Sequence, residues 1–416
     1  MHSIIVQTLV IGATLTFAAR VLSAQTTLDQ PASLLLYPDI ELDTARGVDT
    51  VVQLSNTDPL NPVSVSCYYE TADHSCGVTS FSLNLTSGQP VQWRAGTGLS
   101  TLPLSDKPGP TGQFNFPSFV PPVPNDPFSG SLLCFVVNTD SPPRPLPNDT
   151  LSGSATIERY QQSAQFDAAA YRAIGVGISA NDNPPDDVLI LGGPSGPYNA
   201  CPLSLPAMHY FDGALDAPTS ASSVSTRFVI IPCTQNLGGQ PQRDHVIQYI
   251  VTNEFEQRVT VTRAQSGCEQ AGNISTIDAS APERSVFHAA VQGTLTGQTR
   301  ISADQGTSGI LAVGAETQTE IAEPHLAHGA MFNLASQGLQ PDPDFIILPA
   351  AAAIRVCSGD CDGNGAVSVD ELIRCVNIAL DPDLLGGCLA CDTDRSGDIT
   401  IDEIVVAAGK ALAGCS

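Results

Sequence analysis

The stretch Ser129-Gly130-Ser131-Leu132-Leu133-Cys134-Phe135-Val136-Val137 decides the fold class. Six consecutive apolar residues follow a Ser-Gly turn, and this pattern predicts a fully buried β-strand. Shorter segments upstream alternate apolar and polar residues with a period of two, as half-buried strands do. These segments are Val51–Leu54, Val63–Cys67, Phe81–Leu85 and Val91–Trp93. Strands at this spacing are typical of an antiparallel β-sandwich.

The same kinds of segment recur downstream. Val188–Leu191 and Phe228–Ile231 read as buried strands, and Val246–Ile250 resembles Val51–Leu54. We therefore predict a mainly β chain, with two tandem antiparallel β-sandwich domains followed by a small α-helical module. The predicted ranges are 25–147 for the first domain, 148–348 for the second β-rich domain, 349–356 for a linker and 357–416 for the module. One short helix is expected at Asp167–Ala173.

The composition excludes some classes of partner. The 416 residues include 17 Lys and Arg against 42 Asp and Glu, which gives a formal net charge of −25. Nucleic acid and anionic lipid are both bound by clustered basic residues, so neither is expected as a partner. The 35 Gly and 32 Pro favour a turn-rich β protein over helical bundles.

The N-terminal residues predict export. An apolar run at Ile4–Ala19 is followed by Leu22-Ser23-Ala24, the small-residue ending of a cleaved signal peptide at 1–24. An uncleaved anchor is the alternative, but Arg20 interrupts the run after about sixteen residues and a span needs about twenty. We expect a secreted or cell-surface protein with no membrane span after cleavage.

Twelve cysteines agree with export, because disulfides form in oxidising compartments. Their connectivity is not deducible from sequence. Cys357, Cys361, Cys388 and Cys391 could instead form a four-thiolate zinc site, although export favours oxidation.

The β-rich body shows no catalytic constellation in its sequence. Glycoside hydrolysis needs two carboxylates about 5–10 Å apart. No spacing pairs any two of the candidates, which are Glu70, Asp73, Glu158, Asp167, Asp212, Asp216, Glu254 and Glu256. Gly192–Gly196 differs from a nucleophile elbow and reads as a tight loop. Glu323, His325 and His328 offer a possible metal cluster, and His209 reads as a core or surface histidine.

The last sixty residues state their chemistry most clearly. Two twelve-residue segments, Asp360–Glu371 and Asp392–Glu403, fit the calcium loop in which positions 1, 3, 5, 7, 9 and 12 supply oxygen ligands and Gly stands at position 6. The predicted ligands for two Ca²⁺ ions are Asp360, Asp362, Asn364, Ala366, Ser368 and Glu371 in the first loop, and Asp392, Asp394, Ser396, Asp398, Thr400 and Glu403 in the second. Each loop precedes a segment with helical spacing of apolar residues, and little room is left for an incoming helix.

A loop with only an exit helix, present twice, resembles the dockerin modules of secreted bacterial polysaccharide-degrading systems. The resemblance covers residues 357–416. It implies docking onto a cohesin domain and attachment to glycoside hydrolases. This sequence differs from the family in carrying Glu at position 12 where Asp is usual, in six added cysteines, and in Val369-Asp370 and Ile401-Asp402 at positions 10 and 11. In the family those two positions help to recognise cohesin.

Two functions are therefore weighed. The first is an exported calcium-binding protein whose body is a binding or structural unit, with a dockerin-like module that attaches it to a cohesin-like or other cell-surface protein. The alternative is a secreted polysaccharide-degrading hydrolase, a glycoside hydrolase, that carries the same module. Polysaccharide is a candidate ligand in both. The lack of a catalytic constellation favours the first.

Overall fold

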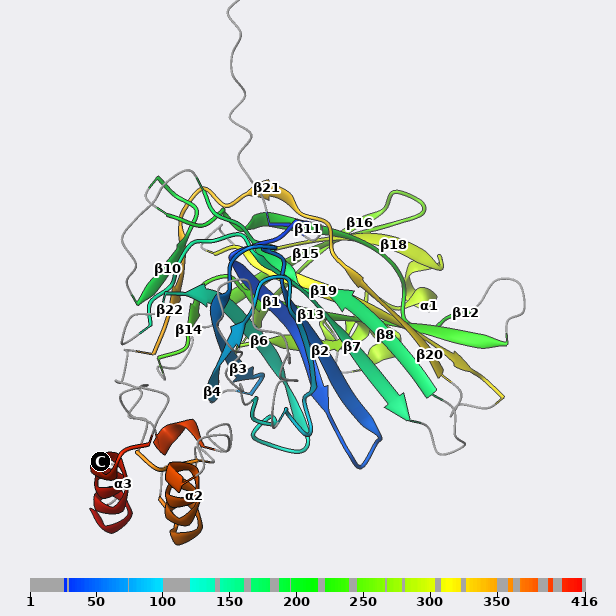
Figure 1. Ribbon diagram of the computed structural model, residues 1–416. Helices are drawn as coiled ribbons and strands as arrows, with labels where there is room; N and C mark the ends of the chain where they lie inside the picture. Colours follow the sequence, from blue (N-terminus) through cyan, green and yellow to red (C-terminus); the bar gives the residue numbers. More distant parts are fainter. Residues whose placement is uncertain are drawn as a thin grey trace, which may run out of the picture.

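The structure is a computed structural model in which strands form the body of the molecule and two helices lie together at one end (Figure 1). It describes residues 26–27, 30–73, 75–99, 120–138, 143–160, 166–179, 187–194, 196–215, 221–238, 245–265, 268–278, 281–303, 308–322, 327–349, 358–361, 367–380, 388–391 and 399–413. The predicted signal peptide and most of the proline-rich stretch 103–127 lie outside these residues.

Five small sheets make up the body. Sheet I has the order β4 (Val78–Leu85), β3 (Val63–Thr71), β6 (Phe128–Val137), β1 (Leu34–Leu42) and β9 (Ile174–Val176). Sheet II has the order β5 (Pro90–Arg94), β2 (Val48–Asn56), β7 (Leu151–Tyr160) and β8 (Phe166–Arg172). Sheet III has the order β10 (Val188–Leu191), β22 (Asp344–Ile347) and β14 (Gln235–Asn236).

The other two sheets come from the second half of the chain. Sheet IV has the order β16 (Arg258–Gln265), β15 (His245–Asn253), β18 (Thr296–Ala303), β11 (Pro202–Tyr210) and β21 (Gln337–Leu339). Sheet V has the order β12 (Ala214–Leu215), β13 (Ser222–Pro232), β19 (Ile310–Glu320) and β20 (Ala327–Asn333), and β17 (Gln270–Asn273) also pairs with β13. The strand pairs are antiparallel except for β14 with β22.

Among the described residues, helical elements are few. The body contains η1 (Ile274–Thr276), η2 (Pro282–Arg284) and α1 (Ala289–Gln292). The C-terminal module contains α2 (Val369–Leu380), η5 (Leu389–Cys391) and α3 (Ile401–Ala413). None of the helices in the described part of the chain has the length and apolar character needed to cross a membrane.

The strand predictions that rest on apolar patterns are confirmed. The opening stretch forms β6, in which Leu132 to Val137 are all buried. The alternating segments upstream form β2, β3, β4 and β5, and the two apolar runs downstream form β10 and β13. Period-two burial is clear in β4, where Phe81, Leu83 and Leu85 are buried and the residues between them are exposed.

The prediction of two tandem β-sandwich domains is wrong. The body consists of five small sheets, and three cores are shared among them. Strand β13 shows why: Val229 and Ile231 on one face enter the first and second cores, while Phe228 and Ile230 on the other face enter the third. One strand thus contributes to every core of the body, which two self-contained sandwiches in series do not allow.

The sheets also cross the predicted boundary near residue 147. Strand β7 pairs along its whole length with β2, and β9 pairs with β1, so chain beyond 148 completes the sheets of the first half. The short helix predicted at Asp167–Ala173 is wrong as well, because this segment forms β8.

Side chains join the edges of sheets II and V. The side-chain amide of Asn333 on β20 accepts a hydrogen bond from the backbone N–H of Arg172 on β8 at 3.1 Å and donates one to the carbonyl of the same residue at 2.8 Å. The carboxylate of Asp167 accepts a hydrogen bond from the backbone N–H of Gly329 at 3.0 Å. These contacts hold β8 and β20 side by side, as the light green and gold strands of Figure 1 show.

Candidate metal centre

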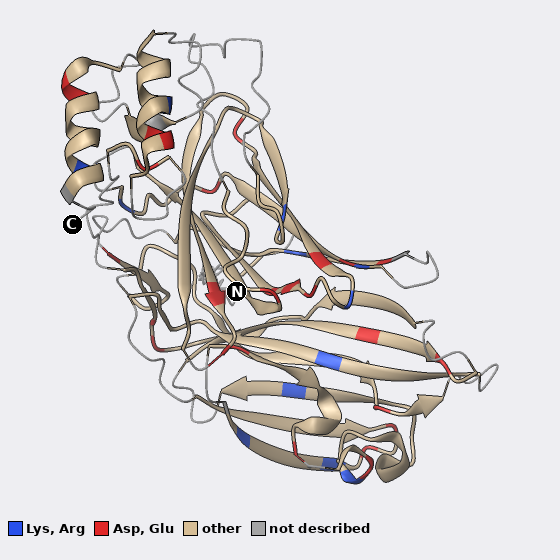
Figure 2. Ribbon diagram, turned by 90° about the horizontal axis from the view of Figure 1, so that it is seen from below, with Lys and Arg blue, Asp and Glu red and all other residues tan. Residues whose placement is uncertain are grey.

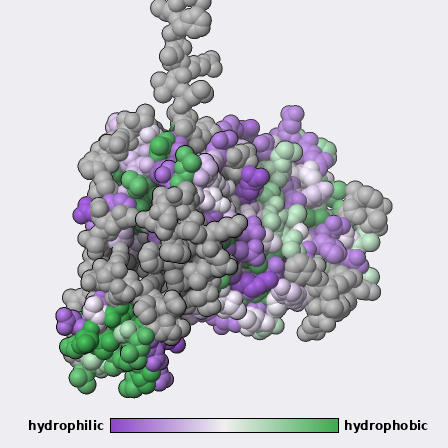
Figure 3. Space-filling model, in the orientation of Figure 1, coloured by the Kyte–Doolittle hydropathy of each residue, from purple (hydrophilic) through white to green (hydrophobic). Residues whose placement is uncertain are grey.

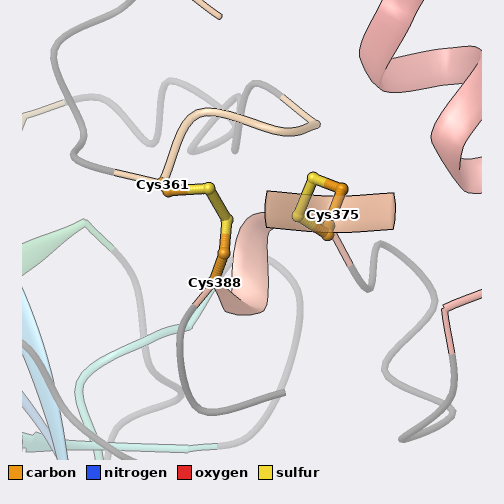
Figure 4. Close-up of side chains that lie close together, drawn as sticks. Cys361, Cys375 and Cys388 are labelled. Carbon is orange, nitrogen blue, oxygen red and sulfur yellow. A yellow bond between two sulfur atoms is a disulfide. The ribbon is translucent and has the colours of Figure 1, made fainter. Parts of the chain in front are cut away.

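The C-terminal module is held together by disulfides around a very small core. Cys361 is bonded to Cys388 and Cys375 to Cys391 (Figure 4). Three of these cysteines are buried, and Ile378 packs with them. A module that buries so few apolar residues needs covalent or metal staples to stay folded. The pairing also answers the zinc alternative, because Cys361, Cys388 and Cys391 are oxidised partners here and not free thiolates.

Disulfides also join the described cysteines of the body. The pairs are Cys67–Cys134, Cys76–Cys268 and Cys201–Cys233. None of the described cysteines is free, and Cys357 and Cys415 lie outside the described residues. The expectation of a disulfide-bonded protein is confirmed. Five disulfides fit the oxidising environment of an extracellular protein.

Each helix of the module begins at the end of a predicted calcium loop. The backbone N–H of Ser368 donates to Glu371 Oε2 at 2.7 Å, and the N–H of Glu371 donates to Ser368 Oγ at 3.3 Å, which is a reciprocal capping box. The second helix repeats part of this arrangement, because the N–H and hydroxyl of Thr400 donate to Glu403 Oε2 at 2.8 and 3.0 Å. The same Ser or Thr and Glu are positions 9 and 12 of the predicted loops.

Capping was missed at the sequence level, although its signal was present. The spacing Ser-x-x-Glu or Thr-x-x-Glu before a helix is the capping-box pattern. It coincides with positions 9 and 12 of the calcium loop, so one pair of residues can fill both roles. Acidic residues in the first turn also stabilise the positive end of a helix, and Figure 2 shows acidic residues in both helices.

The first loop is closed by its last residue. Glu371 is only 6% exposed, and its Oε1 accepts a hydrogen bond from the backbone N–H of Cys361 at 2.7 Å. Since Cys361 is position 2, this bond brings the carboxylate of position 12 back to the start of the loop, next to Asp360. A carboxylate oxygen has two lone pairs, so accepting an N–H does not prevent it from also binding a cation. The described end of the loop therefore fits a hard cation bound by carboxylate oxygens.

Glu403 is in a similar position in the second repeat and is 5% exposed. Burial of both position-12 carboxylates is notable because Glu is almost never fully buried unless it has a partner. The other described ligand candidates are Asp360, Ser368 and Thr400. The remaining predicted ligands lie outside the described residues; they are Asp362, Asn364, Ala366, Asp392, Asp394, Ser396 and Asp398.

The carboxylates considered for catalysis in the body are held separately. Asp212 is buried and accepts hydrogen bonds from the backbone N–H groups of Thr226 and Ser275. Asp73 accepts from Thr71 and Ser75, Glu254 accepts from Thr296, and Glu158 forms an ion pair with Arg94. Glu70 is buried in the interior, Glu256 stands in a turn with a positive φ, and Asp216 lies outside the described residues.

The histidine candidates also have structural surroundings. His209 is buried on β11, its Nε2 is 2.7 Å from Thr299 Oγ1, and burial lowers its pKa. His328 lies on strand β20, and Glu323 and His325 lie outside the described residues. Gly192 and Gly193 have positive φ angles directly after β10, which agrees with a tight loop.

A pocket of about 390 Å³ lies beside the turn between β1 and β2. Three carboxylates line it, but each has a partner: Asp43 pairs with Arg46, Glu41 pairs with Arg227, and Asp73 accepts the bonds named above. Its aromatic residue, Phe128, is 5% exposed. Among the described residues that line it, the pocket therefore shows no unengaged pair of carboxylates of the kind that glycoside hydrolysis uses.

Comparison with known proteins gives no identity. No family model matches the chain, and no curated protein matches it. Among solved structures, the crystal structure of tripeptidyl peptidase 2 (TPP II) aligns with 92% of this chain at 9% sequence identity and a TM-score of 0.13. The chain spans about a third of that protein, 33% of its length. A likeness this weak carries no argument about fold or activity.

Proposed function

We propose that this chain is an exported calcium-binding protein whose C-terminal module attaches the β-rich body to a partner at the cell surface. The observation that carries the calcium proposal is the placement of Glu371 and Glu403. Both carboxylates are buried at the ends of acidic loops, and that of Glu371 turns back to the start of its loop. Ca²⁺ would neutralise the clustered carboxylates and restrain a module that has almost no apolar core.

The resemblance to dockerins supplies the candidate ligand set. Asp360, Ser368 and Glu371 would hold one ion, and Thr400 and Glu403 the other, together with the predicted ligands outside the described residues. Oxygen ligands in a loop of this spacing suit Ca²⁺ better than the smaller, octahedral Mg²⁺.

Calorimetric titration of the full chain with CaCl₂ tests this proposal. Extracellular modules bind Ca²⁺ at roughly 10⁻⁴–10⁻³ M, so the titration extends to about 10 mM. We expect two ions per chain, one in Glu371→Gln, one in Glu403→Gln and none in the double variant. Gln is a suitable replacement because it preserves a capping box while removing the charged bidentate ligand.

The matched control changes the neighbouring carboxylates, Asp370→Asn and Asp402→Asn. Both side chains are exposed at position 11, which supplies no ligand in such loops. This control is expected to bind two ions. A wild-type chain that takes up no Ca²⁺, or an equal loss in the control, contradicts the proposal.

An exposed apolar face on the module supports the attachment role. On α2, Val369, Ile373, Val376 and Leu380 follow one another at i, i+4, i+7 and i+11 and are 41–80% exposed. On α3, Ile401, Val405 and Leu412 are 62–91% exposed. Figure 3 shows these helices as a green, hydrophobic patch. Exposed apolar patches of this kind mark sites of protein association.

The patch includes the positions that dockerins use for recognition. Val369 and Ile401 occupy position 10 of their loops, so the family's recognition position is apolar here. We propose a cohesin-like or other cell-surface protein as the attachment partner, and cohesin is the class tested first. Immobilised cohesin domains should retain the full chain in Ca²⁺ and release it in EGTA, and Ile373→Asp combined with Val405→Asp should abolish retention. Failure of the wild-type chain to bind any cohesin in Ca²⁺ would remove this partner class.

For the hydrolase alternative, the described residues provide no comparable observation, because each candidate carboxylate has its own separate surroundings. Polysaccharide remains a proposed ligand of the body and is tested by binding to a panel of polysaccharides in Ca²⁺.

A further inference from the structure

A series of electrostatic interactions links four acidic side chains and two arginines in the body, and three of the four acids are buried. The acidic cluster consists of Asp39 and Glu41 on β1, Glu70 on β3, and Glu269 immediately before β17; the arginines are Arg159 on β7 and Arg227 on β13. These residues come from both halves of the chain. If all were ionised, the four negative charges would exceed the two positive ones.

The two arginines are occupied by two of the four acids. Arg227 donates from Nη1 to Asp39 Oδ2 at 2.7 Å and from Nη2 to Asp39 Oδ1 at 3.2 Å. Its Nη1 also lies 2.7 Å from Glu41 Oε1, and Arg159 Nη2 lies 3.3 Å from Glu41 Oε2. Asp39 and Glu41 are therefore neutralised by direct ion pairs.

Glu70 and Glu269 have no such compensation. Their side chains are buried, at 2% and 6% exposed, and all four of their carboxyl oxygens lack a hydrogen-bond partner among the described residues. An ionised carboxylate without a donor or counter-charge is very costly in a protein interior, and such a group takes up a proton instead. Burial raises the pKa of Glu70 to about 8. Burial, followed by the negative charge of Asp39, raises the pKa of Glu269 well above its usual range, although Arg227 acts in the opposite direction.

Glu70 and Glu269 lie where a disulfide connects the first half of the chain to the second. A carboxyl oxygen of Glu70 lies within 4.8 Å of the sulfurs of Cys76 and Cys268, the disulfide that connects the halves, and Glu269 follows Cys268 directly. The titratable and charged groups around the pair are Asp39, Glu41, Arg159, Tyr171 and Arg227. The Tyr171 hydroxyl is occupied by the backbone of Asp39, to whose carbonyl it donates at 2.6 Å.

We propose that Glu70 and Glu269 form a proton-dependent latch. Both carboxyls are neutral while the two halves of the chain are packed together. When the carboxyls lose their protons, this packing loosens. The direction follows from linkage. The folded protein holds these protons at a pH at which an unfolded chain has released them, so unfolding releases protons and stability falls as the pH rises. For Glu70 the window runs from its ordinary value of 4.5 to about 8, above which the effect is complete.

The test compares the pH dependence of unfolding in wild type and in Glu70→Gln combined with Glu269→Gln. Between about pH 5 and pH 8, Glu70 should raise the unfolding equilibrium constant of the wild type by up to about tenfold per pH unit, and Glu269, whose pKa is also raised, should add to this slope. Gln has nearly the same shape and cannot ionise, so the double variant should lack this part of the slope. The matched control, Glu320→Gln, changes an exposed carboxylate and should keep the wild-type slope.

Infrared spectroscopy of the folded wild-type chain provides a reading that does not depend on the stability of the variant. At about pH 7.5, ordinary surface carboxylates are ionised, and so is Asp39, whose pKa burial raises only to about 6. We expect a carboxylic-acid C=O absorption at that pH, its loss on alkaline titration, and its absence from the double variant. No carboxylic-acid band in the wild type, or an identical pH slope in wild type and double variant, overturns the proposal.

Discussion

Arg227 balances the charge of two carboxylates in the interior of the body. Its partner Asp39 is fully buried and receives both of its hydrogen bonds from the guanidinium through separate oxygens. Arg227→Ala leaves that carboxylate buried without a partner, so we expect the free energy of unfolding to fall by about 3–5 kcal/mol. Urea denaturation at neutral pH measures the change.

The control for this prediction is a surface arginine in a similar pair. Arg46 Nε lies 3.3 Å from Asp43 Oδ2, but the Arg46 side chain is 84% exposed. Exposed pairs contribute little because water screens them, so Arg46→Ala should leave the denaturation midpoint almost unchanged. If both variants lose a comparable free energy of unfolding, burial does not determine how strongly the Arg227 ion pair stabilises the protein.

Only part of the chemistry of the interior is predictable from the sequence. Glu70 is among the acids that the sequence offers as catalytic candidates, but Glu269 is not. No sequence pattern links the two residues. Their proximity depends on the Cys76–Cys268 disulfide and on the pairing of β17 with β13, both of which are contacts between distant residues. In contrast, Glu371 and Glu403 were identifiable because the calcium loop is a local pattern with fixed spacing.

Among the elements, helix α3 contains a glycine that its surroundings do not require. A Cβ atom added to Gly409 meets no atom within 4 Å. Gly in a helix costs about 1 kcal/mol relative to Ala, so Gly409→Ala should stabilise the module by up to that amount. The thermal midpoint of the helical circular dichroism signal in Ca²⁺ should rise.

Strand β7 provides the opposite case. A Cβ atom on Gly153 would lie 1.9 Å from the Tyr37 hydroxyl oxygen, which donates a hydrogen bond to the carbonyl of Gln53. Gly153→Ala must displace this buried tyrosine, and we expect a loss of about 1–3 kcal/mol in the free energy of unfolding. A neutral effect in thermal or urea unfolding would mean that the strand can move away at no cost.

A strand or helix is predictable where burial follows the sequence pattern. Where burial does not follow the pattern, the prediction fails. The segment Asp167–Ala173 is rich in alanine, a strong helix former, yet it forms β8. Burial decides the outcome, because Ala169 and Tyr171 are buried while Ala168 and Ala170 are exposed, which is the period of a strand. Pairing with β7 fixes this alternation, and single-sequence propensity contains no information about that partner.

For the whole molecule, the Cys76–Cys268 disulfide is the longest-range covalent link described. It joins residues separated by 192 positions. Closing so long a loop restricts the unfolded chain strongly, so Cys76→Ser combined with Cys268→Ser should lower the free energy of unfolding by about 5 kcal/mol in the chain-entropy account. Urea denaturation at pH 6, where the latch carboxyls are neutral in the proposal above, isolates this effect.

The shorter Cys361–Cys388 link, with a separation of 27, is the comparison. Its removal should cost about 3.5 kcal/mol by the same account and should act on the module, which the helical circular dichroism signal reports. If removal of either disulfide lowers the free energy of unfolding of the body by the same amount, loop length does not determine how much a disulfide stabilises this protein.

The number and layout of sheets could not be derived from the sequence. The apolar run Phe228–Ile231 identifies β13 as a buried strand, but it does not show that this strand contributes to three cores at once. A sandwich reading assumes that neighbouring strands in the sequence pack together, and β7 and β9 break this assumption by returning to the first-half strands β2 and β1.

The contact between Asn333 and Arg172 has a consequence for how copies of this protein behave toward one another. A free strand edge offers a row of unpaired N–H and C=O groups onto which another chain can add, and this is a common start of fibril growth. The amide of Asn333 presents one acceptor and one donor to β8, as a backbone peptide would, so two edges cap each other within one chain. The protein thereby lowers its own tendency to polymerise along these two edges.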